Sequence, residues 1–543
     1  MTTTAEQIIK LADLEIGKAL NFRNLYQEVA DLMYPCENQI TEKTTPGEDK
    51  SQDVIDPTGI IALNRATSGF ISAWIPKDRQ FFGIHIKDRM IAELPVVKRW
   101  VALAVQIAHE ELFASNYMQQ LQQTVKSTIG FGTGCSFSEW DRRKSRLNFK
   151  DWHISTYTIK QDITGSVDTI ILSYELTARQ LVDEFGDKAG PKVLEKCRTV
   201  EHESDRSKVI HIVRPRLERN VKFIDSLNMP FESLYVNREE KLVMDEGGFE
   251  EFPFAVPRWE KSSVEKYGRG RGTLMLSAVK LLQRMMYCYL ECGERWNNPS
   301  RWQIDDRIEG DLNNSPGALN HFTEPQAAGA LDSQLNGNFP ITLEALQAQQ
   351  TFIRNEGFFE DIFMHFRNLK GDRRNELELM LKNEEGLDQL VAPVINVESE
   401  LFTPQITRAV LLLIRNGRIP MPPPELHGQE FDIEYMGKLA MASKQYQANG
   451  FIKFSQFMKD VDPIFPRAKY YVSEERAIPD IAIAMGLKAE HLATEDEISA
   501  KIQREEEDKR LARELAVTEA QSQSYKNQTK APEHGSPMET ANA

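Results

Sequence analysis

Near the start of the chain, apolar residues recur at close to helical spacing, which predicts an amphipathic helix over residues 8–32. Pro35 ends this pattern, because the residue before a proline is biased away from helical conformation. A polar stretch leads to a second apolar stripe, which predicts a helix over residues 57–74 that Pro76 stops. A third helix is expected over residues 96–113.

Apolar and polar positions alternate in other parts of the first half, which is typical of strands. Phe82, Ile84 and Ile86 alternate in this way. A longer signal over residues 152–176 predicts a β-hairpin, because its turn contains Gly165. Further strands are predicted at 209–213, 231–236 and 254–259.

One short helix is also predicted in this half. Thr177 is expected to cap it, and Gly186 is expected to end it. With the strands and helices above, the first 260 residues predict a mixed α+β fold. The helical signals further along make the whole chain mainly helical.

The middle of the chain predicts two long helices around an irregular insert. Residues 273–296 form a helical pattern, which corresponds to a length of about 36 Å. The stretch 297–340 is rich in Asn, Pro and Gly, and Thr342 is expected to cap a second helix that ends near Leu369. Together they predict a stalk with a tip. The apolar stripe of the first helix consists of Ala278, Leu281, Leu282, Met285, Tyr289 and Cys292, and its exposed face carries Lys280, Arg284, Tyr287 and Glu291.

Beyond the second long helix lies a basic turn with Lys370, Arg373 and Arg374. A strongly apolar helix is predicted over residues 402–414, and the chain after Phe431 is again expected to be mostly helical. A capping box at Thr494 and Glu497 predicts a charged helix to about residue 520, and the polar residues 521–543 are expected to be disordered.

Composition narrows the class of protein. Of 543 residues, 41% are hydrophobic and 27% charged, as in ordinary globular proteins. The longest wholly apolar run, from Ala409 to Ile414, falls far short of the roughly 18 residues of a membrane span. The opening residues lack the basic and apolar regions of a secretory signal, so the protein is expected to stay in the cytoplasm where it is made.

The cysteines, glycines and histidines of the chain show none of the spacings typical of metal, nucleotide or disulfide sites. The five cysteines are scattered, and Cys288 and Cys292 fall on an apolar stripe, so free thiols in packing roles are expected. The glycine clusters at 130–134 and 268–272 lack dinucleotide and P-loop spacing, which favours backbone turns. The ten histidines show no tight ligand spacing. We therefore expect no cofactor, no metal and no catalytic residues.

The charged residues are compatible with more than one kind of contact with nucleic acid or metal ions. The formal net charge of −15 opposes a broad grip on nucleic acid, although acidic walls would help a duplex slide through a channel. The basic turn could contact phosphates or be an ordinary surface loop. The acidic pairs Asp305–Asp306 and Glu384–Glu385 could serve a metal-dependent nuclease or a solvated face.

Several motifs occur in an order that resembles the head-to-tail connector, or portal, family of short-tailed bacteriophages. The motifs are Asp53 to Ile60 with Ala66 to Trp74 and Pro76, Phe131 to Gly134, the hairpin Gln161 to Asp168 followed by Leu181 to Gly186, Arg258–Trp259 with Tyr267 to Gly270, and Gly417 to Pro420. Their order covers roughly residues 20–520. The chain departs from the family at Arg374 to Leu379, where Thr-Ala-Thr-Glu-Val is usual.

The resemblance implies the portal fold and a division of the chain. It assigns residues 1–272 to a wing, 273–296 and 342–369 to the two stem helices, 297–341 to a clip, 370–430 to a tunnel loop with its helix and the return to the wing, and 431–520 to a helical crown, in which 495–520 is the candidate for a terminal barrel helix. Lys370, Arg373 and Arg374 would then face DNA, and Lys280, Arg284 and Glu291 would lie on the stem surface.

The resemblance also implies a place and partners. A ring of about twelve subunits would sit at one capsid vertex of the virion, where DNA is packaged and ejected. Its partners would be terminase, tail adaptor and tail tube proteins, the scaffolding and major capsid proteins, and double-stranded DNA, with no membrane. Two rival functions remain, a metal-dependent nuclease and a scaffold or adaptor that forms no ring.

Overall fold

The structure is a computed structural model. It describes residues 5–42, 54–76, 80–92, 94–199, 201–220, 225–297, 343–362 and 392–426, with shorter stretches at 301–304, 328–330 and 431–435 and a few single positions. The chain divides into two units, Met1–Lys438 and Leu439–Ala543, and all the described residues belong to the first.

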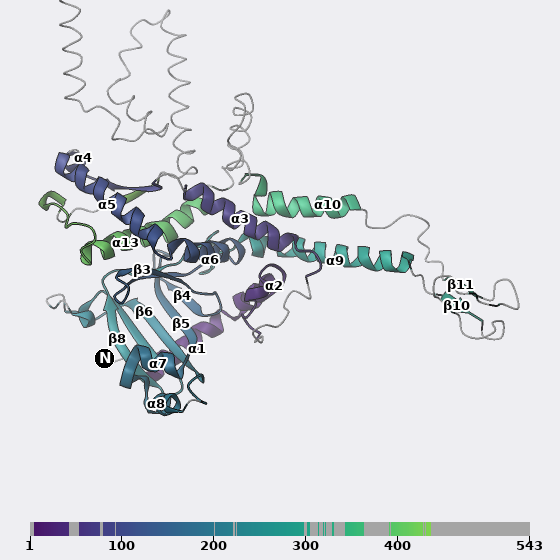
Figure 1. Ribbon diagram of the computed structural model, residues 1–543, viewed down its shortest axis with the longest axis horizontal. Coiled ribbons are helices and arrows are strands. Elements are labelled where there is room, and N and C mark those ends of the chain that lie inside the picture. Colours follow the sequence, from purple (N-terminus) through teal and green to yellow (C-terminus); the bar gives the residue numbers. More distant parts are fainter. Residues whose placement is uncertain are drawn as a thin grey trace, which may run out of the picture. The chain divides into compact units, whose positions relative to one another are not determined.

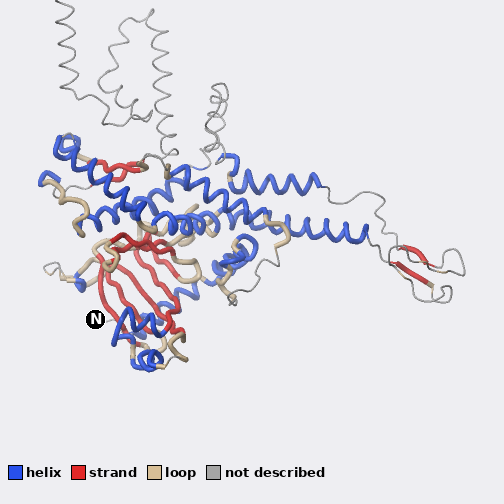
Figure 2. Tube along the Cα trace, in the orientation of Figure 1, coloured by secondary structure: helices blue, strands red, loops and turns tan. Residues whose placement is uncertain are grey.

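A five-stranded antiparallel sheet with the order β4-β5-β6-β7-β8 forms the largest β element of this unit (Figure 2). Its strands are β4 (Tyr157–Gln161), β5 (Val167–Thr177), β6 (Arg206–Pro215), β7 (Phe231–Asn237) and β8 (Leu242–Phe249). Both faces of this sheet carry apolar side chains, so helices can pack on both. Neighbouring residues of a strand point to opposite faces, so Val209 and Ile210 belong to different clusters.

Helices cover the two faces of this sheet (Figure 1). On one face, Ile8 and Ala12 of α1 (Ala5–Lys18) pack with Ile210 and other apolar residues of the central strands. On the other face, Leu181 and Val193 pack with Val209. These two residues belong to α7 (Ala178–Phe185) and α8 (Pro191–Arg198), which a 3-10 turn at Gly186–Ala189 connects. The sheet is thus the middle layer of three.

A group of helices packs beside the sheet and carries two smaller sheets. The helices are α2 (Leu20–Met33), α3 (Thr58–Trp74), α4 (Arg89–Ala92), α5 (Pro95–Ala114), α6 (Tyr117–Gly130) and α13 (Thr403–Arg415). One sheet has the order β3-β2-β9, from β2 (Ser136–Asp141), β3 (Arg146–Asp151) and β9 (Phe254–Ala255), and the other pairs β1 (Phe82–Ile86) with β12 (Phe431–Tyr435). Trp74 stacks on Phe402 with ring centroids 4.9 Å apart, which joins α3 to the start of α13.

Two helices leave this body side by side (Figure 1): α9 (Arg271–Asn297) and α10 (Leu343–Phe352). Between them in sequence lie two short antiparallel strands, β10 (Arg301–Gln303) and β11 (Ala328–Ala330). A π-helical turn, Ile353–Gly357, follows α10, and a second, Glu398–Phe402, precedes α13. Short 3-10 turns occur at Pro35–Glu37, Ser226–Asn228 and Pro424–Leu426.

Many of the predicted elements are confirmed. Helices α3, α5, α9 and α13 agree with prediction to within a few residues. Thr177 caps α7 through a capping box with Gln180, and Gly186 ends the helix as expected. The hairpin of β4 and β5 turns at Gly165, whose φ is +82°. The mixed α+β class is therefore correct.

Two predicted elements in the first half differ from the structure. The helix predicted over 8–32 breaks at Ala19, because α1 packs on the sheet whereas α2 packs on α9 and α3. The strand predicted over 254–259 has only two residues, since Pro253 and Pro257 at its ends have no N–H to donate to a ladder.

Two further predictions in the second half also need correction. The second long helix does not continue unbroken to Leu369, because Phe359 has a φ of +55°; the break allows the consecutive side chains of Phe358 and Phe359 both to be buried. Residues 431–435, expected to be helical, form strand β12, whose alternating Phe431, Ile433 and Tyr435 pair with β1. The predicted helix over 494–520 and the tail 521–543 lie outside the described residues.

Candidate functional site: the helix pair and its anchors

Helix α9 is covered on three sides by its own chain. On the side of α10, Gln349 Nε2 donates to the carbonyl oxygen of Ala278 at 3.2 Å. Val279 and Leu282 are fully buried, and Val279 lies against Gly59 of α3, where an added Cβ would be 3.4 Å away. Toward α2, Lys280 Nζ lies 2.6 Å from Glu28 Oε2. The remaining side faces away from these three helices.

That remaining side carries an apolar stripe. Leu274, Leu281 and Cys288 follow one another at seven-residue intervals, so they lie on one face of the helix. Leu274 is 42% exposed and Leu281 is 51% exposed. Leu281, which the sequence places on the apolar stripe, is therefore only half covered in the single chain. On α10, Leu343 and Phe352 are likewise 56% and 46% exposed.

The residues predicted on the stem surface are all found on α9, where each has a partner in its own chain. Lys280 forms the ion pair with Glu28 described above. The guanidinium of Arg284 lies 5.5 Å from the ring centroid of Tyr287. Glu291 accepts a hydrogen bond from Arg295 at 2.6 Å, one turn further along. These charges border the stripe of Leu274, Leu281 and Cys288.

A first anchor fixes the base of the helix pair to α3. The side-chain oxygen of Gln283 accepts hydrogen bonds from the backbone N–H groups of Ile55 and Asp56, each at 2.9 Å. Its Nε2 donates to the Asp56 carbonyl oxygen at 2.7 Å. Gln350 of α10 donates to Asp56 Oδ2 at 2.7 Å, and Asp56 Oδ1 accepts from the N–H of Thr58 at the start of α3. Asp56 thus connects three helices, with its carboxylate joining α10 to α3 and its backbone held by Gln283 of α9.

A second anchor is a contact between the two glycine-rich segments. A Cβ atom on Gly132 would lie 2.3 Å from the backbone nitrogen of Gly270, and one on Gly270 would lie 2.4 Å from the nitrogen of Gly132. The N–H of Gly268 donates to Thr133 Oγ1 at 2.9 Å. The segments therefore pack backbone against backbone directly before α9 begins. The interpretation of these clusters as backbone turns agrees with this contact.

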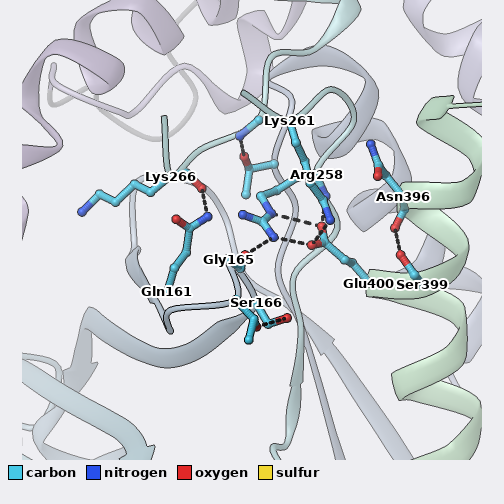
Figure 3. Close-up of polar contacts among 12 residues, drawn as sticks. Gln161, Gly165, Ser166, Arg258, Lys261, Lys266, Asn396, Ser399 and Glu400 are labelled. Atoms are coloured by element: carbon cyan, nitrogen blue, oxygen red, sulfur yellow. Dashed lines mark hydrogen bonds and ion pairs between the residues drawn. The ribbon is translucent and has the colours of Figure 1, made fainter. Parts of the chain in front are cut away.

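A third anchor is a buried ion pair between Arg258 and Glu400 (Figure 3). Glu400 accepts from the backbone N–H of Arg258 at 3.0 Å and from its Nε at 3.1 Å, and Nη2 forms a further, short bond. The same Nη2 donates to the Gly165 carbonyl oxygen at 2.8 Å, and Lys261 lies 2.7 Å from Glu400. Only 3% of the Arg258 side chain is exposed. The hairpin of β4 and β5, the segment before α9 and the π-turn before α13 meet here.

Two more contacts hold the residues directly after the π-turn that follows α10. Arg65 of α3 forms an ion pair with Glu360, and the guanidinium of Arg271 lies 4.1 Å from the ring centroid of Phe359. Burial lowers the pKa of Arg271, although Glu260 opposes this shift. A cation over an aromatic face is stabilising at this distance.

Apart from Arg271 at the start of α9, the described groups with perturbed pKa values lie in the body rather than on the helix pair. Burial raises the pKa of Asp151 to about 7 and lowers that of His211 to about 3. The His211 ring stacks on Tyr235 and shares a hydrogen bond with Ser233. Among the described residues, no group of three or more His, Cys, Asp or Glu side chains could hold a metal ion.

Some predicted residues lie outside the described part. Lys370, Arg373 and Arg374 of the basic turn and the acidic residues Asp305, Asp306, Glu384 and Glu385 are among them. Within the described part, no helix combines the length and the apolar content needed to cross a bilayer. The five cysteines are all free thiols, as expected.

Comparison with known proteins identifies the family. Residues 18–492 match the family described as bacteriophage head to tail connecting protein. The chain belongs to this connector family. The match includes the helix pair and all three anchors. Connector proteins are structural, which confirms the prediction that the chain is not an enzyme.

Two relatives agree with this membership along nearly their whole length. The chain is 24% identical over 533 residues to the portal protein of Salmonella phage epsilon15, which covers 96% of this chain and 95% of that protein. It is 23% identical over 509 residues to the probable portal protein of Bordetella phage BPP-1, which covers 91% and 89%.

Sequence reasoning missed most of the anchoring residues. Asp56 carried a usable signal, because an acidic residue directly before Pro57 and a helical pattern is a frequent helix start. Gln283 and Glu400 carried none, since their partners lie 227 and 142 residues away. Arg258 was noted as part of a motif, without a role.

Proposed function

We propose that this chain is the subunit of a portal ring that sits at one capsid vertex and forms the channel for DNA packaging and ejection. Family membership and the names of the two relatives support the portal role. The observation that carries ring formation is the apolar stripe of Leu274, Leu281 and Cys288, which the single chain leaves partly exposed. We propose that a second copy of the chain packs on this stripe and buries it.

The geometry of the helix pair favours a head-to-tail contact between copies. The stripe lies on α9, whereas Leu343 and Phe352 are exposed on α10, so one copy can offer α9 to the α10 of the next. Such an interface joins two different surfaces, and a series of them closes into a ring when the rotation permits. Fully burying a leucine contributes about 1.5–3 kcal/mol, so a half-exposed one still adds roughly 1 kcal/mol at every interface.

Charge suits a conduit for DNA. Each chain carries a formal net charge of −15, so a ring of about twelve copies would be strongly acidic. Where that charge faces the bore, it repels phosphates and lets a duplex slide instead of stick. In this proposal Lys370, Arg373 and Arg374 bind DNA phosphates weakly within the channel and so resist slippage of the packaged DNA.

The proposed parts of the subunit follow the resemblance. Residues 1–272 would be the wing, α9 and the 342–369 segment the stem, and 297–341 the clip that docks the tail. Residues 370–430 would form the tunnel loop and return, and 431–520 the crown. Terminase would dock during packaging and tail adaptor or tube proteins afterwards, with scaffolding and major capsid proteins as assembly partners.

A mass measurement on the purified full-length chain tests ring formation. Native mass spectrometry is expected to give a multiple near twelve of 62.2 kDa, and single-particle images are expected to show a toroid with a central hole. A monomer or small oligomer under all assembly conditions would favour the scaffold or adaptor function instead.

A pair of variants tests the stripe itself. Leu281→Glu places a charge in the proposed interface and is expected to shift most of the protein from ring to monomer. Leu14→Glu is the matched control, because Leu14 is a helical leucine with a similar exposure, 49% against 51%. Equal ring yields for the two variants would remove the stripe from the interface.

A further inference from the structure

The turn between β2 and β3 is a compact and rigid loop. Asp141 Oδ1 accepts hydrogen bonds from the backbone N–H groups of Arg143 and Lys144, at 2.8 and 3.1 Å. Ser145 adopts a left-handed conformation with a φ of +48°. From the segment after α13, Arg418 Nη2 donates to the Ser145 carbonyl oxygen at 3.0 Å. Both ends of the turn are therefore fixed.

The side chains on this turn are cationic and exposed. Residues 142–146 read Arg-Arg-Lys-Ser-Arg, and all five are exposed. Within the described part of the chain, none of the four cationic side chains has an ion pair or a hydrogen bond. Some other surface cations are paired, such as Lys188 with Asp245 at 3.1 Å. Arg418 adds a fifth cation, a guanidinium, beside them, and its Nε lies 3.8 Å from Glu111.

This cluster stands out in a chain whose net charge is −15. At physiological ionic strength the Debye length is about 8 Å, so a ligand at the turn responds mainly to the charges next to it. The acidic remainder of the chain is then largely screened. A local attraction for anions can exist on a protein that repels them overall.

The residue types favour phosphates of nucleic acid over an acidic protein surface. The centre of a protein–protein interface is usually apolar and aromatic, and residues 142–146 contain no such side chain. Arginine forks bind phosphate oxygens in pairs, and lysine adds a point charge. The turn also offers no aromatic ring on which bases of a single strand could stack.

We propose that the β2–β3 turn, Arg142 to Arg146 with Arg418 beside it, is a contact site for the phosphate backbone of double-stranded DNA, without sequence preference. It is separate from the basic segment at Lys370 to Arg374 and does not depend on ring formation. With the backbone of the turn already fixed, binding orders only the side chains, which reduces its entropic cost.

The test measures binding of a fluorescent 30-base-pair duplex of random sequence to the full-length chain between 50 and 200 mM salt. Four phosphate contacts predict a log–log slope of about −3.6, or roughly a 150-fold loss of affinity over this range. Replacing Arg142, Arg143, Lys144 and Arg146 with Gln is expected to flatten the slope by about 3.6 and to abolish most binding at 50 mM.

A charge-matched control separates the site from the net charge. Changing Lys192, Arg198, Arg206 and Lys208 to Gln removes four exposed cations that are dispersed over α8 and β6, so the net charge changes equally. This variant is expected to bind the duplex like the unchanged chain. Equal losses in both variants would overturn the proposal.

Competition experiments identify the ligand. Poly-glutamate is expected to compete weakly, and a single strand of equal length is expected to bind less tightly than the duplex. Binding of poly-glutamate at the turn without binding of the duplex would overturn the proposal in favour of an acidic protein partner. The mass of every preparation is recorded, so that a failure of ring formation remains distinguishable from a failure of this site.

Discussion

The carboxylate of Glu400 receives both the backbone N–H and the guanidinium of Arg258, which lies 142 residues earlier in the chain. Because the same guanidinium reaches the carbonyl oxygen of Gly165, one side chain joins three separate segments. The pair joins the segment before α9 to the π-turn before α13. It therefore fixes the two ends of the stretch 259–399 relative to each other.

Glu400→Ala is expected to lower the free energy of unfolding by about 3 kcal/mol, since it leaves a buried guanidinium without its counter-charge. Denaturant unfolding followed by tryptophan fluorescence measures this loss. The control is Glu203→Ala, which breaks an exposed pair with Arg179, whose side chain is 68% exposed, and should cost less than about 1 kcal/mol. Losses of equal size would mean that the buried pair contributes no more than a surface one.

Three glycine substitutions separate close contact from backbone conformation. Gly132 and Gly165 both have positive φ, +101° and +82°, but a Cβ on Gly165 would meet nothing within 4 Å. Gly165→Ala should therefore cost about 1–2 kcal/mol from conformation alone. Gly132→Ala should cost roughly 2 kcal/mol more, because its Cβ would collide with the backbone of Gly270.

Gly17→Ala is the third variant of the series and is expected to raise the free energy of unfolding instead of lowering it. Gly17 lies inside α1 with open space around it, so alanine should stabilise the chain by about 0.5–1 kcal/mol. Thermal unfolding of the three variants side by side gives the order. Similar effects of Gly132→Ala and Gly165→Ala would show that the two glycine-rich segments tolerate a wider separation.

The basic segment of the proposed tunnel makes a prediction at the level of the virion. Arg373→Glu combined with Arg374→Glu replaces a weak attraction for phosphates with repulsion, and should reduce the DNA retained after packaging. The measurement is the nuclease-protected DNA per particle. Arg373→Lys with Arg374→Lys keeps the charge and should retain DNA normally. Unchanged DNA retention in the charge-reversed particles would mean that Arg373 and Arg374 do not help to retain the packaged DNA.

Local patterns in the sequence predicted the elements well. Thr177 with Gln180 and the periodic stripe of α3 each depend on residues a few positions apart, and the structure has both. Strand β12 was missed because its partner β1 lies about 350 residues away, and five residues alone carry little signal. Pro253 and Pro257 could have warned that the strand between them is short.

Long-range contacts limited the prediction of the site. The helical spacing of Leu281 predicts a place on the apolar stripe, but spacing does not tell whether the same chain or another one covers it. The glycines at 132 and 270 were recognised as turns, whereas their mutual contact depends on how two distant segments fold. Asp56, Gln283 and Glu400 act through partners that no local pattern could identify.

The last prediction concerns pH, through a buried carboxyl group beneath α6. Asp151 ends strand β3, and its Oδ1 lies 2.6 Å from Thr124 Oγ1, which also lies 3.1 Å from the Gln120 carbonyl oxygen. Burial raises the pKa of Asp151 to about 7; the charge of Glu37 adds to the shift, and the Thr124 hydrogen bond opposes it. A protonated carboxyl can donate to Thr124, which leaves the hydroxyl proton for Gln120.

The sign of the pH dependence follows from the raised pKa. The folded state keeps the proton of Asp151 up to about pH 7, whereas the unfolded chain releases it near pH 3.8. The contribution of this group is thus fully present below pH 3.8 and is lost as pH rises, by about 1.4 kcal/mol per unit until pH 7. Asp151→Asn keeps the shape and removes the titration. Its stability relative to the unchanged chain should rise from pH 4 to 7 and then stay level.

Denaturant unfolding at several pH values gives this difference directly. The difference between the two proteins cancels the other buried groups, such as His211, whose lowered pKa reduces stability as pH falls below 6.5. Glu37→Gln serves as the companion variant. Without the neighbouring charge the pKa of Asp151 falls, so the plateau should begin at a lower pH. Parallel profiles for the unchanged chain and Asp151→Asn between pH 4 and 8 would mean that Asp151 is already ionised in the folded protein.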